Sequence, residues 1–95
     1  MRISDKQRKI ILASTQKCFG EDVQVRLFGS RVDDAKKGGD IDLYVEPQKI
    51  MGALQIAHAR HILEDALEIK VDLVVNNGNV RLPIFEIAKK TGVVL

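Results

Sequence analysis

The stretches Phe28-Gly29-Ser30-Arg31 and Gly38-Gly39-Asp40-Ile41-Asp42-Leu43-Tyr44-Val45 decide the fold of this chain, because each marks the boundary of an apolar run. A glycine and a serine end the first run, and two aspartates, one residue apart, open the next. A third aspartate, Asp72, lies inside a later apolar run over residues 69–75. Acidic side chains among buried apolar residues are costly unless something pairs with them. The three aspartates therefore indicate a divalent cation, and the Gly-Ser turn indicates a bound phosphate.

Apolar alternation predicts strands over residues 23–28, 41–45 and 70–75. Residues 30–36 are expected to form one short helical turn. The link between the first two strands is short for a parallel crossover, so these strands are expected to be antiparallel neighbours. The link between the second and third strands holds a helix and permits a right-handed parallel crossover. This topology brings the Gly-Ser turn and all three aspartates to one corner of the sheet.

Helical spacing of apolar residues predicts three longer helices. Ser4 caps the first helix and Gly20 ends it. Pro83 suits the first turn of the last helix, which Gly92 ends. Between them, residues 49–68 form a long amphipathic helix. Its apolar positions fall into two groups, Ile50, Leu54, Ala57, Ile62 and Ala66 in one and Met51, Ala59, Leu63 and Leu67 in the other. The expected order of elements is α-β-α-β-α-β-α.

The composition of the chain limits its class. We expect one domain over residues 1–95, with an aliphatic core because the chain has no Trp, one Tyr and three Phe. The net charge of +2 does not indicate a nucleic-acid substrate. The single cysteine, Cys18, excludes an internal disulfide and is typical of a reducing compartment. The first residues lack the apolar segment of a signal peptide, and no apolar run could span a membrane. We therefore expect a soluble, cytoplasmic protein.

The three aspartates and the turn have chemistry that fits together. Asp40 and Asp42 point to one face of their strand because successive side chains alternate. Mg²⁺ prefers oxygen ligands and uses one or two carboxylates plus substrate phosphates. Asp72 on the next strand would complete a two-metal site or act as base toward an incoming hydroxyl. Gly29 and Ser30 would present N–H groups and a hydroxyl to a phosphate. The pattern indicates in-line attack at a phosphoryl centre.

The loop after this turn is rich in basic residues. Arg31 follows Gly29 and Ser30 and would offset the charge of a triphosphate, which completes the expected nucleotide-binding set. Lys36 and Lys37 are expected to lie in a solvated turn.

Several residues allow more than one interpretation. Asp72 is either a site residue or an acid on an edge strand that faces water. Tyr44 would pack near a base, in the core or against a partner. The apolar residues 93–95 either dock as an edge strand or meet a partner. His58 and His61 have metal-ligand spacing on a helix, but no further ligand is evident and we expect them at the surface.

Gly29-Ser30 followed by Asp40-x-Asp42 and a later strand aspartate, Asp72, resembles the DNA polymerase β-type nucleotidyltransferase superfamily. The short chain and its ending, residues 84–95, resemble the minimal, antitoxin-like members. The specific motif covers residues 28–45, whereas the order of elements matches along nearly the whole chain. The resemblance implies an α/β (α+β), palm-like fold with a small mixed sheet of three or slightly more strands flanked by helices.

The resemblance also implies roles for these residues. Gly29 and Ser30 would contact the triphosphate, Asp40 and Asp42 would ligate two Mg²⁺ ions, and Asp72 would ligate one ion and activate the acceptor hydroxyl. Family members of this size are encoded beside a helical HEPN protein, which they bind, and they transfer AMP from ATP onto a tyrosine of that toxin.

Two other functions remain open at this point. One is a non-catalytic antitoxin or binding module that neutralises its partner by occlusion. The other is nucleotidyl transfer to a small hydroxylated molecule, although the chain contains no second domain to hold such an acceptor. A partner protein or a second copy of the chain would have to supply the missing acceptor surface.

Overall fold

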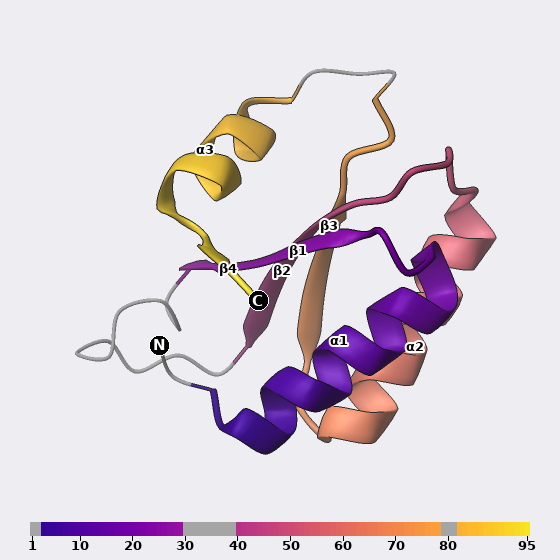
Figure 1. The fold of residues 1–95 in the computed structure, drawn as a ribbon, viewed down its shortest axis with the longest axis vertical. Helices are drawn as coiled ribbons and strands as arrows, with labels where there is room; N and C mark the ends of the chain where they lie inside the picture. The colour runs from indigo at the N-terminus through magenta and orange to yellow at the C-terminus, as the bar shows by residue number, and fades with distance from the viewer. Residues whose placement is uncertain (1–2, 30–39, 79–81) are drawn as a thin grey trace.

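The computed structural model describes residues 3–29, 40–78 and 82–95 (Figure 1). Its elements are α1 (Asp5–Phe19), β1 (Gln24–Phe28), β2 (Ile41–Glu46), α2 (Ala53–Leu67), β3 (Val71–Val75), α3 (Pro83–Thr91) and β4 (Val93–Val94). The expected α+β fold is confirmed, with the strands and long helices in the expected order and β4 added at the end. The short helical turn that was expected over residues 30–36 lies outside the described residues.

The strands form one mixed sheet in the order β3-β2-β1-β4. β1 is antiparallel to β2 and to β4, whereas β2 and β3 are parallel. The antiparallel and parallel pairings predicted from the link lengths are therefore confirmed. In this register Asp42 lies opposite Phe28 on one side and opposite Asp72 on the other. The end of β1 and the starts of β2 and β3 thus meet at one end of the sheet.

The two faces of the sheet are covered differently. α1 and α2 lie side by side on one face, and α3 lies on the other (Figure 1). The core under α1 and α2 is aliphatic apart from one phenylalanine, as the composition predicts. It comprises Ile11, Phe19, Val25, Leu27, Ile41, Leu43, Val45, Ala59, Leu63, Leu67 and Val71. The odd-numbered residues of β2 face this core, so its even-numbered residues, Asp42 among them, face the side of α3.

α1 begins as its sequence predicts. The Ser4 hydroxyl accepts a hydrogen bond from the Gln7 N–H (3.1 Å), and the Gln7 side chain accepts one from the Ser4 N–H (2.9 Å). Its buried positions are Ile11, Thr15 and Phe19, spaced four residues apart. Thr15 is fully buried, and its hydroxyl donates to the Ile11 carbonyl at 2.7 Å, which satisfies this polar group inside the core.

α2 begins at Ala53, so the prediction of a helix from residue 49 was wrong at its start. Gly52 has extended backbone and its N–H donates to the Gln55 side chain at 2.9 Å, which makes it the cap of the helix. Apolar periodicity alone does not reveal such a cap. One predicted apolar group of α2 is buried and includes Ala59, Leu63 and Leu67. In the other group, Ile50 and Leu54 are exposed.

α3 covers the second face of the sheet, and β4 forms its edge beside β1. Phe85 and Ala88 of α3 pack with Phe28 and Tyr44 in a second buried cluster, where the rings of Tyr44 and Phe85 lie 5.8 Å apart. Residues 93–95 then dock as an edge strand against β1, which resolves the alternative left open for this tail. Within the described ranges, no helix combines the length and apolar character needed to cross a bilayer.

Candidate active site

Two hydrogen bonds fix the start of β3, one to the start of β2 and one to α2. The Ile41 N–H donates to the Lys70 carbonyl at 3.0 Å. The Glu64 carboxylate, near the end of α2, accepts from the Val71 N–H at 2.9 Å. These bonds hold the strand register in which the carboxylates of two neighbouring strands lie opposite each other. Sequence reasoning missed Glu64, because nothing in the local pattern connects a helix residue with the first residue of the next strand.

Gly29 lies directly against Asp42. Its φ is +78°, in the left-handed region that favours glycine. A Cβ built on Gly29 would lie 2.9 Å from Cγ of Asp42 and 3.2 Å from its Cβ. The missing side chain therefore gives the Asp42 carboxylate its place beside the backbone of the turn. A larger residue at position 29 would clash with the Asp42 carboxylate, which explains why this position is a glycine.

Asp42 is half-buried and lies near two other negative charges. Burial, and then the negative charges of Asp72 and Asp40, raise the pKa of Asp42 above its ordinary value. Asp40 and Asp72 are both exposed. The three aspartates predicted from the sequence therefore occupy one end of the sheet and repel one another.

These acids do not already form a closed metal cage. In the described ranges, no group of three or more His, Cys, Asp or Glu side chains is gathered closely enough to hold a metal ion. Carboxylate oxygens are nevertheless suitable donors for Mg²⁺, which keeps several waters and shares its coordination with substrate phosphates. The mutual repulsion at Asp42 also favours a bound cation. The donor set therefore fits a hard divalent ion that arrives with a phosphate ligand.

Other predicted residues have different positions. Ser30, Arg31, Lys36 and Lys37 lie outside the described residues. His58 and His61 are exposed on α2, in agreement with the surface interpretation. Cys18 is half-buried and packs against the main core.

A polar network on the same sheet face was missed by sequence reasoning. The Tyr44 hydroxyl donates to Glu46 at 2.7 Å and accepts from the Asn76 amide at 2.8 Å. Lys89 of α3 lies 3.4 Å from the same Glu46 oxygen. Tyr44 is fully buried, so it is a core residue, and burial raises its pKa to about 12. The alternation of β2 could have placed Glu46 on the face of Asp42, but it does not reveal that Lys89 pairs with Glu46 or that Asn76 bonds to Tyr44.

This network ties α3 to the face that carries the carboxylates. Tyr44 contributes both its ring, to Phe85 of α3, and its hydroxyl, to Glu46 and Asn76. The Glu46–Lys89 ion pair adds a second link to α3. α3 is therefore fixed on the same face of the sheet as Asp42.

Comparison with known proteins identifies relatives of this arrangement. A protein-family model for a nucleotidyltransferase domain matches residues 6–94. No significant match was found among curated proteins.

Several solved structures are similar in fold. One is a tri-AMPylated Shewanella oneidensis HEPN toxin in complex with an MNT antitoxin, with a TM-score of 0.79 and 18% identity over 97% of this chain and 71% of that chain. A toxin–antitoxin structure with AMP-PNP has a TM-score of 0.70 and 19% identity, over 87% of this chain and 70% of that one. An MntA–HepT toxin–antitoxin structure has a TM-score of 0.64 and 18% identity, over 90% and 69%. At these identities the likeness shows a shared fold.

Proposed function

This chain belongs to the nucleotidyltransferase domain family, and from that premise we propose that it transfers AMP from ATP to a tyrosine hydroxyl of a HEPN-type toxin and thereby acts as an antitoxin. The observation that carries the proposal is the contact of Gly29 with Asp42, which itself lies opposite Asp72 at one end of the sheet. One of the solved complexes with this fold contains an AMPylated HEPN toxin, and another contains AMP-PNP. Both support the choice of adenine nucleotide and partner.

In this proposal Asp40, Asp42 and Asp72 hold two Mg²⁺ ions. The raised pKa of Asp42, caused by burial and by the other two charges, supports cation binding because a cation would relieve the repulsion. When bound, the ions offset the charge of the triphosphate and of the leaving pyrophosphate.

The residues of this chain would orient the reactants. Gly29, Ser30 and Arg31 would contact the triphosphate, with backbone N–H groups, a hydroxyl and a guanidinium. Asp72, exposed on the edge strand, would take the proton of the acceptor hydroxyl. The hydroxyl oxygen forms a bond to the α-phosphorus, and the bond from that phosphorus to the bridging oxygen of the β-phosphate breaks. AMP remains on the acceptor and pyrophosphate leaves.

Intact-mass measurement tests this proposal. The protein, a co-encoded helical neighbour and Mg²⁺ are incubated with each of the four nucleoside triphosphates, and both chains are weighed. We expect the neighbour to gain AMP units with ATP. Asp42→Asn should abolish the gain, because the substitution removes one carboxylate from the site. Asp65→Asn, the same change at an exposed position of α2, should leave the gain unchanged.

Other outcomes identify the alternatives. A stable complex that blocks the toxin without any mass gain would contradict the transferase proposal and identify an occluding antitoxin. Transfer to a small hydroxylated molecule but not to the protein neighbour would identify the other acceptor class. Loss of the mass gain on chelation by EDTA, and its return with Mg²⁺, would support the requirement for the ion.

A further inference from the structure

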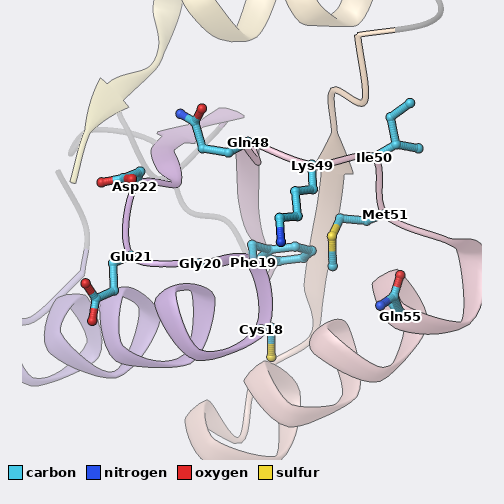
Figure 2. A pocket seen from close by; sticks show the side chains of 10 residues that line it. All are labelled: Cys18, Phe19, Gly20, Glu21, Asp22, Gln48, Lys49, Ile50, Met51 and Gln55. Atoms are coloured by element: carbon cyan, nitrogen blue, oxygen red, sulfur yellow. The ribbon is translucent and has the colours of Figure 1, made fainter.

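A groove runs along the surface between α1 and α2, at the end of the sheet opposite to the aspartates. It consists of two hollows of about 420 and 240 Å³, which share Cys18 and Gln55. Figure 2 shows the larger one, which Phe19 and Met51 line together with residues 20–22 and 48–50. Residues 48–51 follow the end of β2, whereas Asp42 is near its start. The groove is therefore separate from the candidate active site.

Two exposed aliphatic side chains belong to the segment that lines this groove. Ile50 lines the larger hollow and is 69% exposed, and Leu54 is 87% exposed and comes directly before Gln55, which lines both hollows. Their exposure is not explained by a loose backbone. Asn77 holds Met51 through two hydrogen bonds, one from the Met51 N–H (3.0 Å) and one to its carbonyl (3.2 Å). The adjacent cap of α2 fixes the backbone between them. A rigid apolar projection beside a hollow is pre-organised for binding.

The charges around the groove are of both signs. Glu21 and Asp22, in the turn after α1, line the larger hollow on one side, and Lys49 lines it from the segment after β2 (Figure 2). Lys17 lines the smaller hollow. One continuous surface therefore carries an apolar projection, a hollow, an acidic side and a basic side.

We propose that this surface is the interface of a two-fold symmetric homodimer. In such an interface the same patch is used twice, so it must be complementary to itself. Here the projection of Ile50 and Leu54 would enter the groove of the second copy, and the acidic turn of each copy would face the Lys49 segment of the other. A partner of different sequence would need this surface to offer only a projection or a hollow, and only an acidic or a basic side. The co-occurrence of both on one surface favours a second copy of this chain as the occupant.

This dimer would leave the acidic end of each sheet accessible. The groove lies at one end of the strands and the aspartates at the other, so the two candidate active sites would face away from the interface. The inference does not depend on the nucleotidyl acceptor and goes beyond the proposed function.

Analytical ultracentrifugation tests the dimer. We expect the wild-type chain to self-associate with increasing concentration, and Leu54→Asp to raise the dissociation constant at least about tenfold. Ile87→Asp is the matched control, because Ile87 is a 53% exposed aliphatic residue on α3, outside the groove. It should leave the association unchanged. Circular dichroism checks that each variant is folded.

Charge exchange provides the second test. Lys49→Asp and Asp22→Lys should each weaken the dimer, and the double variant should regain most of the lost affinity, because the two positions exchange charges across the interface. A wild-type chain that stays monomeric at every concentration would overturn the proposal. So would an equal effect of Leu54→Asp and Ile87→Asp. A monomeric chain that needs Leu54 only to bind a helical neighbour would overturn it too, and would assign the groove to that neighbour.

Discussion

Gly29 and Asp42 are in close contact at the acidic end of the sheet. We expect Gly29→Ala to destabilise the protein by about 2–4 kcal/mol, because a positive φ adds strain and the new methyl group must displace the carboxylate. Gly78→Ala is the matched control, since Gly78 has φ +83° and, apart from its chain neighbours, no atom of the described residues lies within 4 Å of a built Cβ. Gly78→Ala should lower the free energy of unfolding only by the backbone strain, about 1–2 kcal/mol. Urea unfolding of both variants measures the difference, and equal losses would refute the contact.

The ionisation of Tyr44 can be measured directly, and its pKa reports the surroundings of this side chain. It is the only tyrosine and the chain has no tryptophan, so the ultraviolet absorbance of tyrosinate reports this residue alone. Burial raises its pKa to about 12, the Asn76 hydrogen bond lowers it and Glu46 raises it. We expect a titration midpoint near that value in the folded protein, and near the ordinary value of 10.0 in urea. A folded protein whose tyrosine titrates at the ordinary value would contradict the buried network.

The sign of the accompanying stability change follows from linkage. The unfolded chain ionises at the ordinary pKa of 10.0, whereas the folded chain holds its proton until about 12. Between these values the folded state binds more protons, so the contribution of Tyr44 to stability falls as pH rises. In Tyr44→Phe, the free energy of unfolding should therefore fall less steeply as the pH rises between these two values than in the wild-type protein.

Gly92 joins α3 to β4 at a point where there is no room for a side chain. A built Cβ would meet the Ala88 carbonyl and lie 3.2 Å from the Leu27 carbonyl. We expect Gly92→Ala to push β4 away from β1 and to destabilise the protein by about 1–3 kcal/mol. Hydrogen exchange should quicken at the Leu95 N–H, which donates to Val25. The Asn76 N–H, which donates to Val45 beside β3, is the internal control. Equal acceleration at both amides would refute a local effect.

The boundaries of elements show where sequence reasoning succeeds and fails. The start of α1 was predictable because Ser4 and Gln7 form a local capping box. The start of α2 was not, because its cap, Gly52, has no side chain that would signal it, and because Met51 is held by Asn77, which lies beyond β3. The burial of Thr15 could not be predicted from apolar spacing, because Thr15 is polar and its burial depends on a hydroxyl bond back to Ile11. A cap made by a serine side chain can be predicted from the sequence, whereas a cap made by a glycine backbone and bonds between distant elements cannot.

For the whole molecule, the topology was predictable from the lengths of the links, and with it the meeting of Asp42 and Asp72. Strand alternation and parallel pairing are sufficient for that inference. The Tyr44 network was not predictable, because it needs α3 docked on one particular face and a residue from the end of β3. The exposed pair Ile50 and Leu54 had the spacing of core residues, and only the packed fold distinguishes the buried group from the exposed one.

The pairing of β1 with β4 has a consequence during translation. β4 follows β1 by more than 60 positions, and the nearby bond from Arg8 to the Leu95 carbonyl spans 87. At about 5–20 residues per second, a ribosome releases β1 on the order of 3–13 seconds before its outer partner. During that interval the nascent chain presents a bare strand edge, which is a template for pairing with other chains. The docking of β4 thus removes this template from the newly synthesised molecule.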